Sequence, residues 1–244
     1  MKKFFEALAN VWKIEELKNR IMVTLGLLLV YRFGAQVTLP GIDATKLEGL
    51  ASQTDQGIGS ILNMFTGGAF SQASVFALGI MPYISASIVV QLMGIAVPYL
   101  QKLQKDGESG RKKINQITRW LTIAITLVQG PGYIYNLYRT LPSEAFLLGF
   151  NSFSFLFSAV VILVTGTIFA MWLGEKITDK GIGNGISLLI MVGIIARLPE
   201  AFLQEFVSTV SQDQGGLVKL VFEIILWLLI IIASILLVMA VRKI

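Results

Sequence analysis

The apolar stretch between residues 57 and 98 is interrupted in a way that an ordinary membrane-crossing helix is not. Its first part, Ile58 to Phe65, holds only eight residues. A helix that rises about 1.5 Å per residue needs about 20 residues to cross a bilayer. Thr66-Gly67-Gly68 then breaks the pattern before a second apolar run, residues 73–97, with Pro82 near its start. In hydrocarbon, non-helical backbone is tolerated only where protein buries it or where it lines a water-filled cavity. The stretch therefore predicts a half-helix, a turn and a full span, as in a pore or transport site.

The composition of the chain places it in a membrane. Of its 244 residues, 55% are hydrophobic and 14% are charged, and its mean hydropathy is +0.72. A soluble domain of this size could not bury so much apolar surface, so we expect an all-α polytopic membrane protein. The chain contains no cysteine and no histidine. Their absence excludes disulfides, thiolate or imidazole metal sites, and catalysis that depends on either residue.

Six apolar segments are expected to cross the membrane, with the half-helix between the first two. They are residues 21–35, 73–97, 117–135, 152–173, 186–198 and 217–241. The segment before them, residues 1–20, carries Phe4, Phe5, Leu8, Val11 and Trp12 at helical spacing. This spacing predicts an amphipathic helix on the membrane surface. Glutamates precede the first apolar run and no clear small-residue cleavage site follows it, which favours an uncleaved N-terminus.

The distribution of lysine and arginine predicts the orientation. With the N-terminus inside, residues 1–20, 99–119, 174–183 and 242–244 hold fifteen of the twenty basic residues. This positive-inside bias places the N-terminus in the cytoplasm and makes the half-helix enter and leave from the outer face. It also explains the net charge of +5 without a nucleic-acid partner, and we predict no direct nucleic-acid site. Arg32, near the outer end of the first span, is expected to extend to the interface.

Two glycine-rich segments invite a nucleotide-binding interpretation that their context excludes. Residues 107–113 lack the spacing of a phosphate-binding loop, and the charged segment 99–119 is expected to be a solvated cytoplasmic turn or a docking surface. Residues 181–185 lie between two membrane helices without a βαβ unit, so a tight hairpin is expected there. No catalytic constellation emerges, because the acidic residues lie in loops apart from Glu223, near the outer end of the last span, and no ionisable residue lies deep in a span. We therefore predict no enzymatic activity, no cofactor and no metal site.

The side chains of the broken stretch suggest how a pore could close. Branched or flexible apolar residues are concentrated there, namely Ile61, Met64, Ile80, Met81 and Ile84. Each taken alone is more simply explained as core, but a ring of such side chains can close a pore by dewetting. Ser85, Ser87 and Gln91 recur near one side of the second span. Polar side chains of this kind join helices by hydrogen bonds, and at a seam that opens they would set the cost of parting.

Two long segments of the chain resemble signatures of the SecY family, the pore subunits of the protein-conducting translocon. One runs from Ser74 to Met93 and contains Gly79-Ile-Met-Pro82, and the other runs from Trp172 to Leu189 and contains Gly181-Ile-Gly-Asn-Gly185. Residues 63–68 are similar to the family's plug, and residues 107–113 are similar to the loop between its second and third helices. The motifs occur in the family's order over essentially the whole chain.

The resemblance implies a fold of ten helices in two inverted halves around an hourglass pore, of which this chain would supply the first half and the sixth helix. It implies three domains: a cytoplasmic N-terminal helix over 1–20, a five-helix half over 21–199 with a plug over 57–70, and the first helix of the second half over 217–244. On this basis the chain is expected to pass secretory chains across the membrane and membrane spans sideways into it. Because it ends after the sixth span, we expect that it cannot form a sealed channel alone.

The resemblance also implies roles for particular residues and partners. The pore ring would contain Ile80, Ile84 and Ile190. The plug would contain Ile58, Ile61, Leu62, Asn63, Met64, Phe65, Gly67 and Gly68. The lateral gate would contain Ser85, Ser87 and Gln129, and cytoplasmic partners would dock on Lys102, Lys105, Arg111, Lys112 and Lys113. The implied partners are SecE, SecG, the SecA motor, the ribosome, signal sequences, nascent chains and the lipid bilayer, and the implied location is the bacterial plasma (inner) membrane.

Two other classes of protein remain as alternatives. A secondary transporter also uses broken helices, and half of one is the first alternative. It would be favoured by an ionisable residue or a polar substrate site deep in a span, and neither is visible. A membrane-embedded enzyme is the second, and it would need a serine–lysine or paired-aspartate arrangement that the spans lack.

Overall fold

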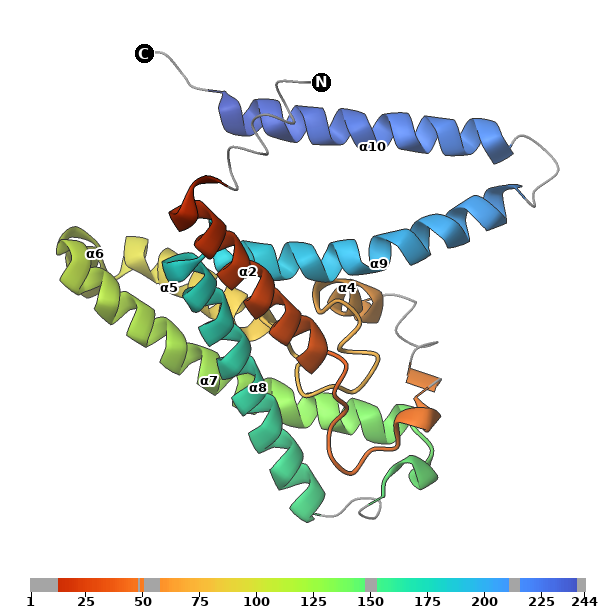
Figure 1. Ribbon diagram of the computed structural model, residues 1–244. Coiled ribbons are helices and arrows are strands. Elements are labelled where there is room, and N and C mark those ends of the chain that lie inside the picture. The colour runs from red at the N-terminus through yellow and green to blue at the C-terminus, as the bar shows by residue number, and fades with distance from the viewer. Residues whose placement is uncertain (1–12, 48, 51–57, 148–152, 211–215, 241–244) are drawn as a thin grey trace. The chain divides into compact units, whose positions relative to one another are not determined.

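The computed structural model describes residues 13–47, 49–50, 58–147, 153–210 and 216–240 (Figure 1). Within these ranges the chain is helical apart from turns, loops and two isolated β-bridges, Thr38 with Ser74 and Ile42 with Phe146. The expected all-α fold is therefore confirmed. The chain forms two compact units, residues 1–196 and 197–244, and each is considered by itself below.

The helices follow one another with short connections. They are α2 (Glu15–Gly34), the 3-10 turn η1 (Ala44–Lys46), α4 (Ile58–Phe65), α5 (Met81–Ala96), α6 (Pro98–Lys105), α7 (Gly107–Thr140), the 3-10 turn η2 (Ser143–Ala145), α8 (Phe153–Lys180), α9 (Gly185–Val210) and α10 (Gly216–Met239). The last residues of α9 belong to the second unit together with α10. Of the amphipathic helix expected over residues 1–20, residues 15–20 belong to α2, and residues 1–12 lie outside the described ranges.

Each of the six expected spans coincides at least in part with a helix, but the helices differ in apolar length. Among the described residues, α8, α9 and α10 are long and apolar enough to cross a membrane. A fourth span results if α5 and α6, which meet at an angle of 100°, are counted together. The helices at the first and third expected spans, α2 and α7, are not apolar enough over a sufficient length to be counted as spans on the same criterion. The number of six spans therefore stays a prediction.

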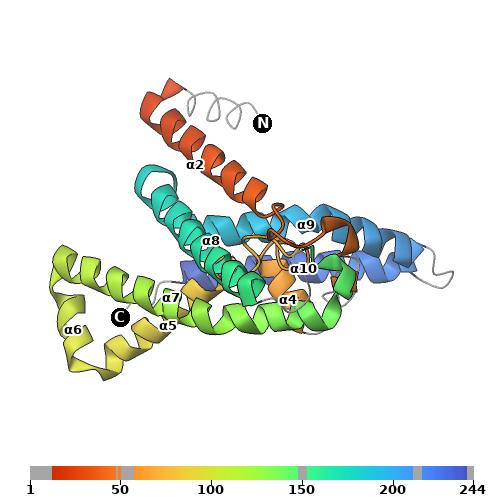
Figure 2. The same ribbon diagram turned by 90° about the horizontal axis from the view of Figure 1, so that it is seen from below.

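Three of the expected boundaries are wrong. The second span was expected from residue 73, but α5 begins only at Met81. The charged segment 99–119 was expected to be a turn, yet it forms α6 and the first turns of α7 (Figure 2). The fifth span was expected to end before Pro199, but α9 continues through this proline to Val210. Proline inside a membrane helix is tolerated where neighbouring groups satisfy the backbone that it frees.

The sharp bend between α5 and α6 follows from local sequence. Val97 precedes Pro98 and has extended backbone angles, φ −101° and ψ 116°. Proline disfavours a helical conformation in the residue before it, and its own φ suits the first position of a new helix. Leu100 and Leu103 of α6 are buried, so the short helix turns an apolar face to the protein and leaves its lysines in solvent.

Residues 66–80 form a non-helical connector between α4 and α5. Gly67, Gly68, Ala73 and Gly79 all have positive φ angles, between 45° and 93°. This left-handed region favours glycine and interrupts any helix. The connector pairs with the chain that follows α2, because the N–H of Leu39 donates to the carbonyl of Ala73 at 2.8 Å and the N–H of Val75 donates to the carbonyl of Val37 at 2.9 Å. These bonds satisfy backbone groups of a segment that is not helical.

Two groups of buried apolar side chains hold the connector in place. One joins it to α7, α8 and the outer loops and is centred on Leu39, Ile134 and Phe155. The other joins it to α2, α8 and the start of α9 through Phe76, whose ring stacks on Tyr31 at 5.6 Å and on Phe169 at 6.0 Å between ring centroids. The connector is therefore a packed part of the core.

The turn between α8 and α9 is the tight hairpin that the sequence predicts. Asn184 Oδ1 accepts hydrogen bonds from the N–H groups of Ile186 and Ser187 and so caps the start of α9. A Cβ atom on Gly185 would lie 2.0 Å from the carbonyl oxygen of Gly174. The second glycine-rich motif is therefore explained by close packing of two helices.

The loops before α4 and after α7 are joined by a hydrogen bond and an ion pair. The N–H of Asp43 donates to the carbonyl of Ala145 at 2.9 Å, and Lys46 forms an ion pair with Glu144 at 3.3 Å. Asp43 accepts hydrogen bonds from the side chain and backbone of Thr45, which lower the pKa of its carboxyl group.

Candidate functional site

Helix α4, which contains most of the expected plug residues, is exposed on one side and buried on the other. Ile61 and Met64 are 53% and 43% exposed, whereas Asn63 is 1% exposed. Asn63 Oδ1 accepts a hydrogen bond from the N–H of Ser71 at 3.1 Å, which folds the first part of the connector back onto the helix. Leu62 and Phe65 are half-buried, and Gly67 and Gly68 of the expected plug are buried. The structure thus brings the expected plug residues together in α4 and the turn after it, with the side chain of Ile58 outside the described set.

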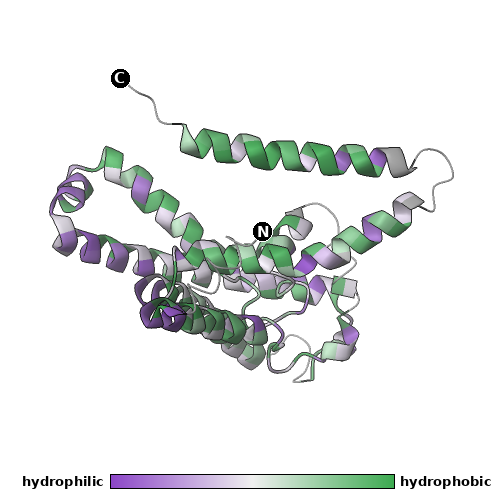
Figure 3. Ribbon diagram, turned by 45° about the horizontal axis from the view of Figure 1, so that its top comes forward, coloured by the Kyte–Doolittle hydropathy of each residue, from purple (hydrophilic) through white to green (hydrophobic). Residues whose placement is uncertain are grey.

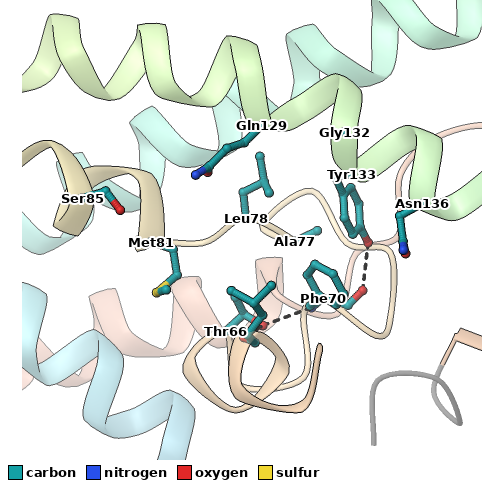
Figure 4. A pocket seen from close by; sticks show the side chains of 11 residues that line it. Thr66, Phe70, Ala77, Leu78, Met81, Ser85, Gln129, Gly132, Tyr133 and Asn136 are labelled. Carbon is teal, nitrogen blue, oxygen red and sulfur yellow. Dashed lines mark hydrogen bonds between the residues drawn. The ribbon is translucent and has the colours of Figure 1, made fainter. Parts of the chain in front are cut away.

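A cavity of about 420 Å³ separates this segment from α5 and α7 (Figure 4). It is lined by Leu62, Thr66, Phe70, Ala77, Leu78, Met81, Ser85, Gln129, Gly132, Tyr133 and Asn136. Two of the three residues expected at the lateral gate, Ser85 on α5 and Gln129 on α7, face each other across it in Figure 4. The third, Ser87, is not part of this lining and accepts a hydrogen bond from Gln91 at 3.1 Å. The cavity is mainly apolar with polar groups on two walls.

The three expected pore-ring residues occupy different surroundings. Ile80 is 4% exposed and belongs to the buried group around Phe76, and Ile84 packs against the same group. Ile190 follows Leu189 of that group and lies half-buried in a shallow groove of about 340 Å³. The structure therefore places Ile80 and Ile84 at one buried group, whereas Ile190 is connected to that group only through its neighbour in sequence, Leu189.

Two contacts at the plug base were not predicted from the sequence. Arg32 was expected to extend to the membrane interface, but its guanidinium donates a hydrogen bond to the carbonyl of Gly67 at 2.7 Å. Tyr133 on α7 donates its hydroxyl to the carbonyl of Phe70 at 2.8 Å. Both acceptors are backbone carbonyls, which carry no residue-specific signal. An arginine in a membrane span was the one indication that the sequence offered.

The expected docking residues form a basic, exposed surface on α6 and the start of α7. Its members are Lys102, Lys105, Arg111, Lys112 and Lys113, all of them exposed. Hydrophilic residues are concentrated at this end of the α5–α6–α7 hairpin in Figure 3, whereas the bodies of the helices are mainly hydrophobic. Lys112 pairs with Glu108 at 2.9 Å, and Arg119 further along α7 pairs with Glu175 of α8.

The described residues offer no other chemistry. They contain no group of three or more histidine, cysteine, aspartate or glutamate side chains that could hold a metal ion. The charged pairs within them lie at helix ends, on loops or near the start of α10, and none faces the cavity beside α4. The candidate site is therefore a mainly apolar cavity with part of its wall formed by α4 and the non-helical connector.

Comparison with known proteins identifies relatives of this chain by sequence. The family model for SecY matches residues 74–244. The protein translocase subunit SecY of Escherichia coli strain K12 is 48% identical over 201 residues, which are 82% of this chain and 44% of that protein. The subunit of the same name from Buchnera aphidicola subsp. Acyrthosiphon kondoi is also 48% identical over 201 residues, 82% of this chain and 55% of that protein. The chain spans about half the length of the curated relatives it matches.

Solved structures share the fold at lower sequence identity. The structure titled "Sec61 in the Canine ribosome-channel complex from the endoplasmic reticulum" matches with a TM-score of 0.55 and 21% identity over 88% of this chain and 47% of that one. "The structure of a protein conducting channel" matches with the same TM-score and 22% identity, over the same shares of the two chains. The architecture is therefore that of the Sec61/SecY channels. With relatives at 48% identity and a family model that covers most of its length, this chain belongs to the SecY family.

Proposed function

We propose that this chain forms part of a protein-conducting channel that passes secretory chains across the plasma membrane of a bacterium and releases membrane spans sideways into it. The observation that carries this proposal is the eight-residue helix α4 followed by the folded connector, residues 66–80. A segment that is too short to span and is packed among spanning helices closes a passage that its removal would open. Membership of the SecY family supports the same role.

The resting seal is proposed to combine the plug helix with the apolar ring. Ile80 belongs to one buried group, Ile84 packs against that group, and Ile190 follows Leu189 of the same group. Branched aliphatic side chains exclude water from a narrow opening and adapt to different side chains of a passing polypeptide. No covalent step is required of this chain, so the energy for transport is assigned to its partners.

The cavity beside α4 is proposed to mark the lateral gate. Ser85 and Gln129 stand on its two walls, and the rest of the lining is mainly apolar. An apolar segment could replace contacts with these walls on its way to lipid, whereas a hydrophilic chain could not. The domain division at residues 20, 199 and 217 and the cytoplasmic N-terminus are part of the same proposal.

The basic surface of α6 and α7 is proposed to dock cytoplasmic partners, namely the ribosome or the SecA motor, while SecE and SecG pack on the membrane part. Replacing Arg111 and Lys113 by glutamate, alone or together, is expected to slow association with either partner by about 10-fold at low salt, because the attraction between the basic surface and an oppositely charged partner surface is lost. The difference is expected to shrink at high ionic strength. Association kinetics over a salt series measure it, with Arg139→Glu, on the opposite end of α7, as the matched control. Equal rates for the double variant and wild type at low salt would refute this docking surface.

The proposed function is tested by transport into liposomes. The channel complex that contains this subunit, reconstituted with the SecA motor and ATP, is expected to move a secretory precursor into a protease-protected space. The same precursor without its signal sequence is expected to stay outside. Equal protection of both precursors, or of neither while the complex is intact, would contradict the proposal.

A further inference from the structure

Two hydrogen bonds fasten the base of the plug to two different helices. Arg32 of α2 donates to the carbonyl of Gly67 at 2.7 Å, and Tyr133 of α7 donates to the carbonyl of Phe70 at 2.8 Å. The two acceptors are three residues apart in the connector. Between them lies Gly68, and both Gly67 and Gly68 have positive φ angles, +63° and +93°. Gly67 is therefore itself bound to α2, and Gly68 lies between it and the residue bound to α7.

The surroundings of the two donors, Tyr133 and Arg32, favour these hydrogen bonds. The Tyr133 side chain is 5% exposed, and its ring packs edge-on against the ring of Phe70 at 4.9 Å between centroids. Arg32 is half-buried and forms no ion pair within the described part of the chain. A charged donor in such surroundings makes a stronger hydrogen bond than a neutral one. Among the described residues, the guanidinium group of Arg32 donates its hydrogen bond to the carbonyl of Gly67.

The base of the plug fits closely, and the plug helix beyond it fits less closely. A Cβ atom on Gly67 would lie 2.8 Å from the Cα atom of Gly193 in α9. Gly193 is buried as well, so the two backbones meet without side chains between them. In α4, by contrast, Ile61 and Met64 are exposed by 53% and 43%. The helix can therefore leave its place more readily than the base can.

We propose that Arg32 and Tyr133 are positioning residues that hold the plug base between α2 and α7, so that separation of these helices is transmitted to the plug through Gly67 and Gly68. The inference rests on the proposed channel function for its consequence, since α7 also carries Gln129 on the wall of the gate cavity. When α7 moves away from α2, the hydrogen bond from Tyr133 pulls Phe70 with α7, while the hydrogen bond from Arg32 keeps Gly67 at α2. The glycine pair absorbs the difference because glycine crosses between backbone regions at little cost.

Hydrogen–deuterium exchange tests the two fixed points without any transport assay. The amides to follow belong to Gly68, which bonds to the carbonyl of Asn63, and to Phe70 and Ser71, which bond to the side chains of Thr66 and Asn63. In the subunit isolated from its membrane, Arg32→Gln is expected to speed their exchange by about 10- to 100-fold, and Tyr133→Phe by about 3- to 10-fold. Arg32→Lys, which keeps a charged donor, is expected to restore part of the protection.

The chain offers matched controls on one face of α7. Arg139 lies over the ring of Tyr135 at 5.3 Å, and both side chains are exposed. Arg139→Gln and Tyr135→Phe remove the same chemical groups away from the plug and are expected to leave these amides unchanged. Tyr133→Phe keeps the packed ring, so it guards against loss of folding. Unchanged exchange in both test variants, or an equal rise throughout α8, would overturn the proposal.

A leak measurement separates this inference from the channel proposal. In liposomes that contain the complex at rest, Arg32→Gln is expected to raise ion release by about 10-fold, and Arg32→Lys is expected to raise it less. Faster amide exchange with no added leak in a complex that transports precursors would overturn the link from the base to the seal. A wild-type complex that neither conducts nor transports would instead count against the channel function itself.

Discussion

Replacing Gly166 by alanine is expected to destabilise the fold by about 3 kcal/mol or more, near the upper end of the range for overpacked sites. A Cβ atom at this position of α8 would lie 2.1 Å from the carbonyl oxygen of Val75 and 3.2 Å from the ring of Phe76. The oxygen belongs to the connector, whose backbone cannot retreat without breaking the bond from the Val75 N–H to Val37. The ring is held by its stacking on Tyr31 and Phe169. Thermal unfolding of the purified subunit measures the loss.

The matched control is Gly26→Ala in α2. This glycine also lies in a helix interior, and a Cβ atom there would meet nothing within 4 Å. The change is expected to be neutral or to stabilise the helix by about 0.5–1 kcal/mol, because alanine loses less backbone entropy than glycine. A stability of Gly166→Ala within about 0.5 kcal/mol of wild type, the range of ordinary surface changes, would show that the connector does not press on α8.

The sequence predicted the break in the membrane region but not the shape of the connector. The short apolar segment and the glycines after it indicate a half-helix and a turn, and α4 confirms them. Residues 73–80 are apolar enough to read as the start of a span. They are instead non-helical, because Leu39 and Val75 take part in backbone bonds between segments more than 30 residues apart. Local propensity contains no information on such pairing.

The charged end of the α5–α6–α7 hairpin carries a helical signal that its charge obscures. The high charge of residues 99–119 favours a turn, but Leu100 and Leu103 recur at helical spacing, and both are buried. Val97-Pro98 is a common signal for the start of a helix. The charge belongs to the outer face of α6 and α7.

The candidate site was predicted in part from chemistry and in part from family resemblance. The apolar character of Ile80 and Ile84 pointed to a seal from the residues alone. The choice of Gln129 came from the resemblance, and the structure places it with Ser85 on one cavity. The hydrogen bonds from Arg32 and Tyr133 to the base of the proposed plug were predicted neither from the residues nor from the family resemblance. Each bond depends on where a distant backbone carbonyl lies, and only the folded chain defines that position.

We propose that a translocating polypeptide passes along the ring of Ile80, Ile84 and Ile190. Site-specific photo-crosslinking is expected to give adducts from residues of this ring and none from residues outside the path. Ile84 packs against the buried group around Phe76, which we propose seals the resting passage, so a photoreactive residue at this position tests the path. With a secretory chain arrested during transport, it is expected to give adducts to that chain, and Ile190 is expected to do so as well. The contrast arises because only residues that line the path come within bond-forming distance of the cargo.

The comparison site is Phe157 of α8, an apolar residue whose side chain is 64% exposed. We expect adducts from Ile84 and none above background from Phe157, and the Ile84 adducts should vanish when the signal sequence is removed. Equal labelling from both sites, or labelling from Phe157 alone while transport proceeds, would contradict the assignment of this chain to the wall of the channel.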